Sequence, residues 1–416
     1  MFFTMREIGV SEDIGGQNPL ALEIENKIRD NGPIPFSEYM RICHDGLASI
    51  PGFYSSGEEV IGDSDGRISG KRVDFTTSPE RSPLFGFMIA RQILEMRVLM
   101  GEPDDFTVVE MGAGNGTLAR DILGGLEYFD PEAASFIRYK IVENSCALIE
   151  RQKDTLKGFQ AEFIEQSATE PLDEPITGII LSNELLDDLP THIVRRTQSG
   201  YEELYIESGN VNEFSEIWLP PSEVVTDYLR RYEISVGEGE LFPISTEAER
   251  WMKSAGASLK QGYILTFDYD YFTPNRPFRV FAAPSKGITK DEAVAYRIKS
   301  EVGKVNVTSE VYFQALAETG KLDGLQVVGD VTQGGFLQGL AFHFFRDRFG
   351  LEYSKLPQRI RGDRLFHMPR ADELLSSLRV LIQSKGVETG IALMGAKWVY
   401  HDNTGKEEKT FRPLLV

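Results

Sequence analysis

The sequence predicts an α/β fold of the nucleotide-binding kind, and three observations support this prediction. Residues Phe106–Leu123 read as a short apolar strand, a glycine turn and an amphipathic helix. Further apolar runs follow it, at Tyr139–Glu143, Thr177–Asn183 and Tyr263–Tyr269, and polar or acidic residues stand at or just after their ends. The chain has 416 residues, which is enough for two to three domains or one large α/β domain with additions.

Composition and charge exclude several functional classes. The chain has 44 Lys and Arg against 64 Asp and Glu, a formal net charge of −20, so nucleic acid is not expected as a partner. An acidic surface suits a basic protein segment instead. The two cysteines, Cys43 and Cys146, are far apart and the five histidines are scattered, so neither a disulfide framework nor a metal site is expected.

Location is predicted from what the chain lacks. Residues 1–17 have neither a basic segment followed by an apolar one nor an Arg-rich transit sequence. No apolar run approaches the roughly 18 residues that would predict a membrane-spanning helix. These features favour a cytoplasmic protein without a membrane span.

The N-terminal region reads as helical. Residues 19–47 predict two helices, which Asn31–Pro35 separates. An acidic, Gly-rich stretch follows, and then a helix is expected from about Ser82 to Met100. Thr77 and Ser78 precede Pro79 ahead of this helix, and from the residue types alone they are interpreted as a helix cap.

The glycine turn indicates the ligand by its spacing. A dinucleotide fingerprint needs G-x-G-x-x-G, but Thr117 stands where the last glycine should be. The pattern is instead Glu110 followed by Gly112, Gly114 and Gly116. A carboxylate before the turn suits a ligand with positive charge, and S-adenosylmethionine carries both an ammonium and a sulfonium. A glycine-rich turn without a ligand is the alternative that the motif leaves open.

The second strand adds a candidate for the sugar of the nucleoside. Tyr139–Glu143 ends in an acid, and an acid at this strand tip accepts hydrogen bonds from ribose hydroxyls in related folds. Glu143 is alternatively an ordinary charge at a strand end. A third strand is expected at Ala161–Ile164, which would bring Glu165 or Gln166 near an adenine.

The second chemical stretch is Asn183–Pro190. An apolar strand runs into Asn183 and Glu184, and Asp187 follows three residues after Glu184, so a helical turn would place both carboxylates on one face. Paired acids beside a sulfonium could hold a cationic nucleophile such as a guanidinium. Asp188 is interpreted as part of a solvated turn. His192 is interpreted either as a base or as a structural histidine.

The remaining chain continues the alternation of elements. Residues 192–218 are expected to form β-hairpins, and Asp270–Lys290 reads as an aromatic, basic loop over the substrate. The other expected elements are helices near Glu223–Ser235, Thr246–Gln261, Ser309–Leu316, Phe336–Phe345 and Asp372–Gln383, and strands at Leu325–Val331 and Ala392–Tyr400.

Several of these stretches together resemble the MidA-like family of S-adenosylmethionine-dependent methyltransferases, whose mitochondrial member methylates an arginine of a respiratory complex I subunit. The similar segments share the order and spacing of the family motifs, over roughly residues 25 to 340. They are residues 30–54, residues 74–86 (similar to Phe-Ile-Thr-Ser-Pro-Glu), Glu110–Leu118 (similar to Glu-Leu-Gly-Pro-Gly-Arg-Gly-Thr-Leu), Asn183–Pro190 (similar to Asn-Glu-Phe-Phe-Asp-x-Leu-Pro), Phe267–Tyr269 and Val331–Gly334.

The resemblance implies a fold and an organisation. It implies a seven-stranded Rossmann-like methyltransferase sheet with an N-terminal helical segment and inserted β and helical elements. The expected regions are an N-terminal segment (1–73), a cofactor-binding core (74–190), an insertion (191–260), and the rest of the core with a C-terminal extension (261–416).

The resemblance also implies a function and a set of site residues. The expected function is methyl transfer from S-adenosyl-L-methionine to a protein side chain, arginine by resemblance, with a respiratory-complex subunit as a candidate partner and a homodimer left open. The expected cofactor-binding residues are Glu110, Gly112, Gly114, Gly116, Thr117, Glu143, Asn144, Thr77, Ser78 and Asn183; the expected catalytic residues are Glu184, Asp187 and Asp268.

The chain departs from the family pattern at the two central motifs. Ala113 and Asn115 replace a proline and an arginine, and Leu185 and Leu186 replace two phenylalanines that are interpreted as shaping the acceptor pocket. Two alternatives therefore stay open: a non-catalytic S-adenosylmethionine-binding assembly factor, and a methyltransferase for small molecules.

Overall fold

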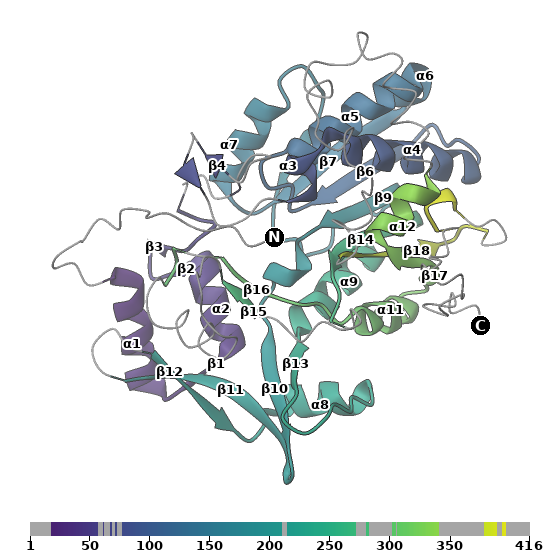
Figure 1. Cartoon of the computed structure of the whole chain (residues 1–416). Coiled ribbons are helices and arrows are strands. Elements are labelled where there is room, and N and C mark those ends of the chain that lie inside the picture. Colours follow the sequence, from purple (N-terminus) through teal and green to yellow (C-terminus); the bar gives the residue numbers. More distant parts are fainter. Residues whose placement is uncertain are drawn as a thin grey trace. The chain divides into compact units, whose positions relative to one another are not determined.

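A computed structural model of the chain describes residues 18–56, 61, 67–68, 71–72, 77–209, 214–271, 280–282, 302–304, 306–340, 378–388 and 393–396. The chain divides into two compact units (Figure 1). Unit 1 comprises Met1–Glu58, Pro190–Ile244 and Phe278–Ser309, and unit 2 comprises Glu59–Leu189, Ser245–Pro277 and Glu310–Val416. Most of the expected substrate loop, residues 272–279 and 283–290, lies outside the described residues.

Unit 2 contains a seven-stranded sheet with the strand order β17-β18-β14-β9-β6-β7-β8. Its strands are β6 (Phe106–Met111), β7 (Ile137–Glu143), β8 (Glu162–Glu165), β9 (Ile176–Asn183), β14 (Leu259–Tyr269), β17 (Gln326–Thr332) and β18 (Leu378–Lys385). The strands from β14 to β8 are parallel, and β18 runs antiparallel to both of its neighbours. This sheet confirms the predicted seven-stranded α/β fold.

Helices cover both faces of the sheet because successive strand residues point to opposite sides. Val108 and Leu265 pack in one cluster with α4, α5 and α12, whereas Val109 and Ile264 pack in another with α9 and α11. The helices of unit 2 are α3 (Ser78–Arg81), α4 (Pro83–Leu99), α5 (Thr117–Phe129), α6 (Pro131–Ala134), α7 (Cys146–Thr155), α9 (Thr246–Ser258), α11 (Phe313–Leu322) and α12 (Gln333–Gly339), with 3₁₀ turns η1 (Leu186–Asp188) and η4 (Met394–Ala396). The unit is therefore a three-layer sandwich, visible in the upper part of Figure 1.

The C-terminal region corrects two predictions. Leu378–Gln383 lies in strand β18, not in a helix, because it fits between β14 and β17, where apolar side chains are buried on both faces. Met394–Ala396 is a 3₁₀ turn and not part of a strand. The rest of the two predicted elements, residues 372–377, 392 and 397–400, lies outside the described residues.

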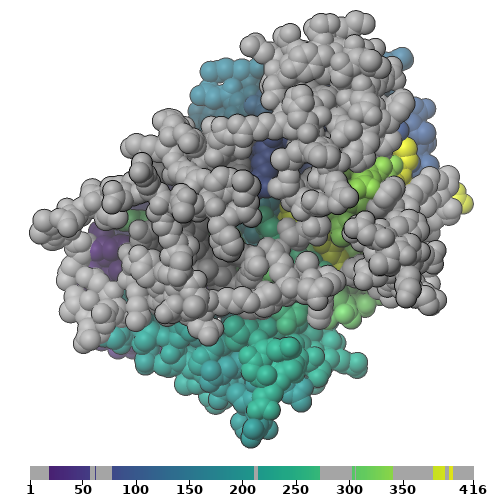
Figure 2. Space-filling model, in the orientation of Figure 1, coloured from purple at the N-terminus to yellow at the C-terminus, as the bar shows by residue number. Residues whose placement is uncertain are grey.

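Unit 1 combines the N-terminal helices with the inserted strands. Ile24 and Met40 of the helices share one buried cluster with Ile193 and Ile206 of the strands. The elements are α1 (Pro19–Asn31), α2 (Phe36–Asp45), α8 (Glu223–Arg231), β1 (Ile34–Pro35), β10 (His192–Thr197), β11 (Gly200–Ser208), β12 (Phe214–Leu219) and β13 (Leu241–Ile244), with the short pairs β2–β3 (Gly46–Leu47, Ile50–Pro51) and β15–β16 (Val280–Ala282, Val307–Ser309). The teal surface in the lower part of Figure 2 belongs to this unit's inserted strands and α8.

Two further features complete the described chain. Two strands of two residues each, β4 (Arg67–Ile68) and β5 (Lys71–Arg72), pair antiparallel in the region of the acidic, Gly-rich stretch. Among the described residues, none of the helices combines the length and apolar character that crossing a membrane requires.

Candidate functional site

The glycine turn joins β6 to α5 at the carboxyl edge of the sheet. Gly112, Gly114 and Gly116 have φ values of +71°, +53° and +78°, which L-residues with a side chain rarely adopt. A Cβ atom at Gly112 would lie 2.7 Å from Leu185 Cδ1, and one at Gly116 would lie 3.2 Å from Gln152 Cα. The backbone conformation therefore favours glycine at all three positions, and the close approach of Gln152 Cα adds a packing reason at Gly116.

Glu110 is buried at the end of β6, with 2% of its surface exposed. The Tyr139 hydroxyl on β7 donates a 2.6 Å hydrogen bond to its Oε2 atom. Burial raises the pKa of Glu110 to about 7; the hydrogen bond from Tyr139 opposes the rise, and the nearby charge of Glu143 adds to it. A cationic group that approached Glu110 would favour its ionised form.

Glu143 is the last residue of β7, and its carboxylate accepts hydrogen bonds from uncharged donors. Its Oε1 atom accepts hydrogen bonds from the backbone N–H groups of Asn144 and Ser145, each 3.0 Å long, and Oε2 accepts one of 3.1 Å from Gln152 Nε2. Burial raises its pKa, and these hydrogen bonds oppose the rise. Glu110 and Glu143 thus lie within electrostatic reach of each other beside the glycine turn, as the interpretation of the motif requires.

Glu80 of α3 is a residue that the motif analysis missed. Its Oε1 atom accepts hydrogen bonds from Thr117 Oγ1 (2.7 Å) and Asn115 Nδ2 (3.1 Å), the two residues on either side of Gly116. The hydroxyl of Thr117, predicted to contact the cofactor, is therefore directed to Glu80. Glu80 could have been found from the sequence, because it is the glutamate of the Ser-Pro-Glu segment that resembles the family motif.

Glu184 follows β9 in a strained conformation, with a φ value of +50°. Its Oε1 atom accepts hydrogen bonds from Ser78 N (3.1 Å) and Asn183 Nδ2 (3.3 Å), and Oε2 accepts one from the Tyr269 hydroxyl (3.1 Å). Burial raises the pKa of Glu184, and these hydrogen bonds oppose the rise. The carboxylate is thus fixed by the neighbouring Asn183 and by residues from two other segments, Ser78 of α3 and Tyr269 of β14.

Ser78 connects more of these motifs. Its hydroxyl accepts a 3.0 Å hydrogen bond from Gln333 Nε2, at the start of α12. Thr77, by contrast, is the N-cap residue of α3 without a hydrogen bond from its side chain to the helix. Tyr269 and Gln333 were not predicted as site residues, although each lies within a motif that resembles the family.

Asp268 is fully buried at the end of β14, and its carboxylate binds backbone. Oδ2 accepts a 2.8 Å hydrogen bond from Leu186 N, and Oδ1 accepts one of 2.8 Å from Tyr269 N. Burial raises the pKa of Asp268 to about 8, and the hydrogen bonds oppose this rise. The geometry gives Asp268 the role of fixing the η1 turn, on which Asp187 lies.

Asp187 differs from the other acids of this edge. It is 6% exposed, and its Oδ1 atom has no hydrogen-bond partner within the described parts of the chain. Burial and the charges of Asp268, Asp188 and Glu184 all raise its pKa well above the ordinary value. This buried oxygen is an acceptor for a donor that the described chain does not supply.

The two leucines of the second motif have different environments. Leu186 is buried in the core cluster with α9 and α11, so its side chain stabilises the fold. Leu185 is half-buried and packs against Gly112. Only Leu185 lies at the glycine turn, and it links that turn to the segment that carries Glu184 and Asp187.

His192 lies in unit 1, at the start of β10. Its Nδ1 atom is 2.7 Å from Glu203 Oε1 and 3.3 Å from Ser37 Oγ. Burial alone would raise the pKa of Glu203, but the hydrogen bonds from His192 and from Ser222 N outweigh burial and lower it. The contacts agree with the structural interpretation of His192.

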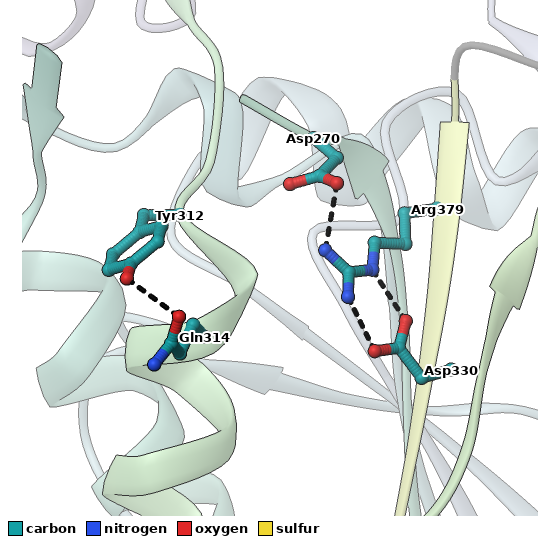
Figure 3. Close-up of polar contacts among 5 residues, drawn as sticks. All are labelled: Asp270, Tyr312, Gln314, Asp330 and Arg379. Atoms are coloured by element: carbon teal, nitrogen blue, oxygen red, sulfur yellow. Dashed lines mark hydrogen bonds and ion pairs between the residues drawn. The ribbon is translucent and has the colours of Figure 1, made fainter. Parts of the chain in front are cut away.

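A separate acidic cluster lies at the same edge of the sheet and contains its own cation, Arg379 (Figure 3). The Arg379 guanidinium on β18 binds both oxygens of Asp330 at 2.5 Å and Asp270 Oδ2 at 2.7 Å. Its central carbon lies 5.3 Å from the centre of the Phe313 ring. The cluster ties together the ends of β14, β17 and β18.

The residues at the glycine turn fit S-adenosylmethionine. Two buried amide oxygens, Gln152 Oε1 and Asn183 Oδ1, have no partner among the residues described. They lie at the same edge of the sheet as the glycine turn, together with the buried acids Glu110 and Glu143, so acceptors for ammonium and hydroxyl groups are present. When bound, S-adenosylmethionine supplies a methyl group that its sulfonium has already activated. In the described chain, no His, Cys, Asp or Glu side chains gather as a metal site.

Sequence relatives agree with this chemistry. The chain is similar to the protein arginine methyltransferase NDUFAF7 homolog of Drosophila melanogaster, with 27% identity over 78% of this chain and 75% of the relative. It is 26% identical to human NDUFAF7 over 69% of this chain and 70% of the relative. The Caenorhabditis elegans homologue is 30% identical over 206 residues, and the match spans about half of that relative (46%). These relatives are named mitochondrial, which contradicts the prediction of a cytoplasmic location. The lack of a recognisable targeting pattern, on which that prediction was based, does not specify a compartment.

A solved structure supports the fold. A protein from Burkholderia thailandensis, described as a likely methyl transferase and crystallised with S-adenosyl-homocysteine, aligns with a TM-score of 0.73 and 24% identity over 91% of this chain and 95% of that chain. The family model described as "Putative S-adenosyl-L-methionine-dependent methyltransferase" matches residues 88–331, which include the glycine turn, the Asn183–Pro190 segment and Asp268. The chain belongs to this family of S-adenosyl-L-methionine-dependent methyltransferases.

Proposed function

We propose that this methyltransferase transfers the methyl group to an arginine side chain of a protein. The relatives from fly and human are named protein arginine methyltransferases, and each alignment covers at least two thirds of both chains. The observation in this chain that carries the proposal is the buried oxygen of Asp187. Glu184 and Asp268 lie close enough to Asp187 to raise its pKa.

A guanidinium suits this position because it offers several N–H donors and a positive charge. Without a bound cation Asp187 favours its protonated form, since burial and like charges raise its pKa. The approach of a cation favours its ionised form. A guanidinium would therefore be recognised by both hydrogen bonding and charge.

Asp187 would also accept the proton that the substrate must lose on methylation. An arginine has a pKa above about 12 and its nitrogens are already protonated, so the nitrogen that gains a methyl group must lose a proton. Of Glu184, Asp187 and Asp268, only Asp187 has a buried oxygen without a partner among the described residues, so this oxygen is the one placed to take the proton. Glu184, held by Ser78 and Tyr269, would orient the guanidinium, and Asp268 would hold the turn.

Labelled S-adenosylmethionine and arrays of arginine and lysine peptides test the proposal. Label transfer to arginine, located by mass spectrometry and lost in Asp187→Asn, is expected. Transfer to lysine or to small amines alone would contradict it. Cofactor binding without transfer to any acceptor from host extracts would favour the non-catalytic assembly factor.

The relatives also support a location and a partner class. We propose a mitochondrial location, since the relatives are named mitochondrial. The acidic composition supports a basic protein segment as the substrate. Cell fractionation, followed by comparison of protein methylation with and without this gene product, tests both; an unchanged pattern of arginine methylation would contradict the substrate class.

A further inference from the structure

Gln152 of helix α7 lies between the two halves of the cofactor site. It is fully buried, and its Nε2 atom donates hydrogen bonds both to Gly114 O (3.0 Å) and to Glu143 Oε2 (3.1 Å). The glycine turn and the acid of β7 are therefore linked through one amide group. No sequence motif indicated this residue.

The orientation of the amide is determined by its partners. Gly114 O and the Glu143 carboxylate are both acceptors, so the NH₂ group must face them. The amide oxygen then faces elsewhere, and it has no partner among the residues that the structure describes. A buried acceptor of this kind costs about 1–3 kcal/mol unless a donor arrives.

The backbone of α7 at Gln152 also packs against the glycine turn. A Cβ atom at Gly116 would lie 3.2 Å from Gln152 Cα, so α7 packs directly on the last glycine. Glu143 accepts three hydrogen bonds from this chain, which leaves one acceptor direction of Oε2 open. Two acceptors, one from each residue, are thus available beside the turn.

We infer that Gln152 is a cofactor-binding residue: its amide nitrogen positions Glu143 and the glycine turn, and its amide oxygen accepts a hydrogen bond from a ribose hydroxyl of the nucleoside. This inference rests on cofactor binding alone and does not depend on arginine as the acceptor. A failure of one proposal can therefore be distinguished from a failure of the other.

Calorimetric titration of the full chain with S-adenosylhomocysteine and its 2′-deoxy and 3′-deoxy analogues tests the role of the oxygen. In the unmodified protein, loss of the contacted hydroxyl should weaken binding about fivefold. In Gln152→Leu, binding of S-adenosylhomocysteine should weaken by tenfold or more, and loss of the same hydroxyl should cost nothing further. Equal effects of the hydroxyl in both proteins would overturn the inference.

A second variant tests the role of the nitrogen. Gln152→Glu would place two carboxylates against each other, so binding of S-adenosylhomocysteine should be weakest at pH 8. It should recover toward the unmodified value as the pH falls to 6, because the pair can then share a proton. A deficit that does not change with pH would overturn this part.

Gln383→Leu is the matched control, since Gln383 is an equally buried glutamine of the same unit, on β18. Neither amide atom of Gln383 has a hydrogen-bond partner among the described residues, so Gln383→Leu should not lower thermal stability. Gln152→Leu removes two hydrogen bonds, and of the two variants only Gln152→Leu should weaken binding of S-adenosylhomocysteine. If both variants weaken it alike, Gln152 has only a structural role.

Discussion

Two acidic clusters at the same edge of the sheet differ in what neutralises them. In the first, Asp270 and Asp330 hold the guanidinium of Arg379 (Figure 3). The second contains Glu184, Asp187 and Asp268, and none of the ion pairs within the described residues involves these acids. Arg81 influences Glu184 only through its charge at a distance.

The difference indicates which cluster is structural and which is open to a substrate. A buried carboxylate keeps its charge only when a cation or several donors compensate the loss of water. Arg379 provides such compensation, so the first cluster is complete without a ligand. Asp187 lacks such compensation among the described residues. The cluster around Arg379 shows how carboxylates of this chain bind a guanidinium.

The largest expected effect is on catalysis. Asp187→Asn keeps the shape of the side chain but removes its charge and its capacity to take a proton. Methyl transfer should fall about 10²- to 10⁴-fold, as for loss of a general base, while the Kd for S-adenosylhomocysteine changes less than about twofold. Radiolabel transfer and calorimetry measure the two. Asp173→Asn, at an exposed acid, is the control and should change neither; full activity of Asp187→Asn would refute the open-cluster interpretation.

The next effect is on stability, and it concerns the complete cluster. Arg379→Met leaves Asp270 and Asp330 without their cation, so the free energy of unfolding should fall by about 3–5 kcal/mol. Arg379→Lys should cost less, because a lysine keeps the charge but not the two parallel hydrogen bonds. Urea denaturation measures both. Arg138→Met removes an exposed partner of Asp105 and should cost no more than about 1 kcal/mol; an equal loss in both methionine variants would contradict this account.

A third prediction concerns pH, because the pKa of Asp268 is about 8 and that of Glu110 about 7. These groups bind more protons when folded than when unfolded, so the ligand-free protein should lose stability as the pH rises from about 4 to about 8. Each contributes a slope of up to about 1.4 kcal/mol per pH unit. Glu110→Gln should flatten the slope below about pH 7, and Asp268→Asn should flatten it up to about pH 8. Denaturation at pH 5, 6.5 and 8 is the measurement; unchanged slopes would show that these acids are ionised throughout.

The smallest effect concerns Glu80, whose partners are hydroxyl and amide groups and not a cation. Glu80→Gln keeps an oxygen for Thr117 and Asn115, so the Kd for S-adenosylmethionine should change less than about twofold. Glu80→Leu removes both hydrogen bonds and should raise this Kd about three- to tenfold. Calorimetry distinguishes the two variants. A large effect of Glu80→Gln would mean that the charge of Glu80, and not its hydrogen bonding, supports the glycine turn.

Local pattern was sufficient for much of the fold. The glycine turn, the strands that include Glu143 and Asn183, and the helix from Pro83 follow from apolar runs with clear ends. Strand β18 could not be predicted in this way, because a short run such as Leu378–Gln383 is compatible with a helix or a buried strand until its neighbours are known. The neighbours, β14 and β17, are distant in sequence.

By itself, the sequence determined where the acids and glycines are placed, because each follows a strand and parallel strands end at one edge of a sheet. Only the tertiary structure decided what each acid does. Asp268 binds the backbone of a turn more than 80 residues earlier in the chain, whereas Asp187 keeps an unpartnered oxygen among the described residues. The physical reason is that the charge state of a buried carboxylate depends on the donors and cations around it, which come from segments far apart in the sequence.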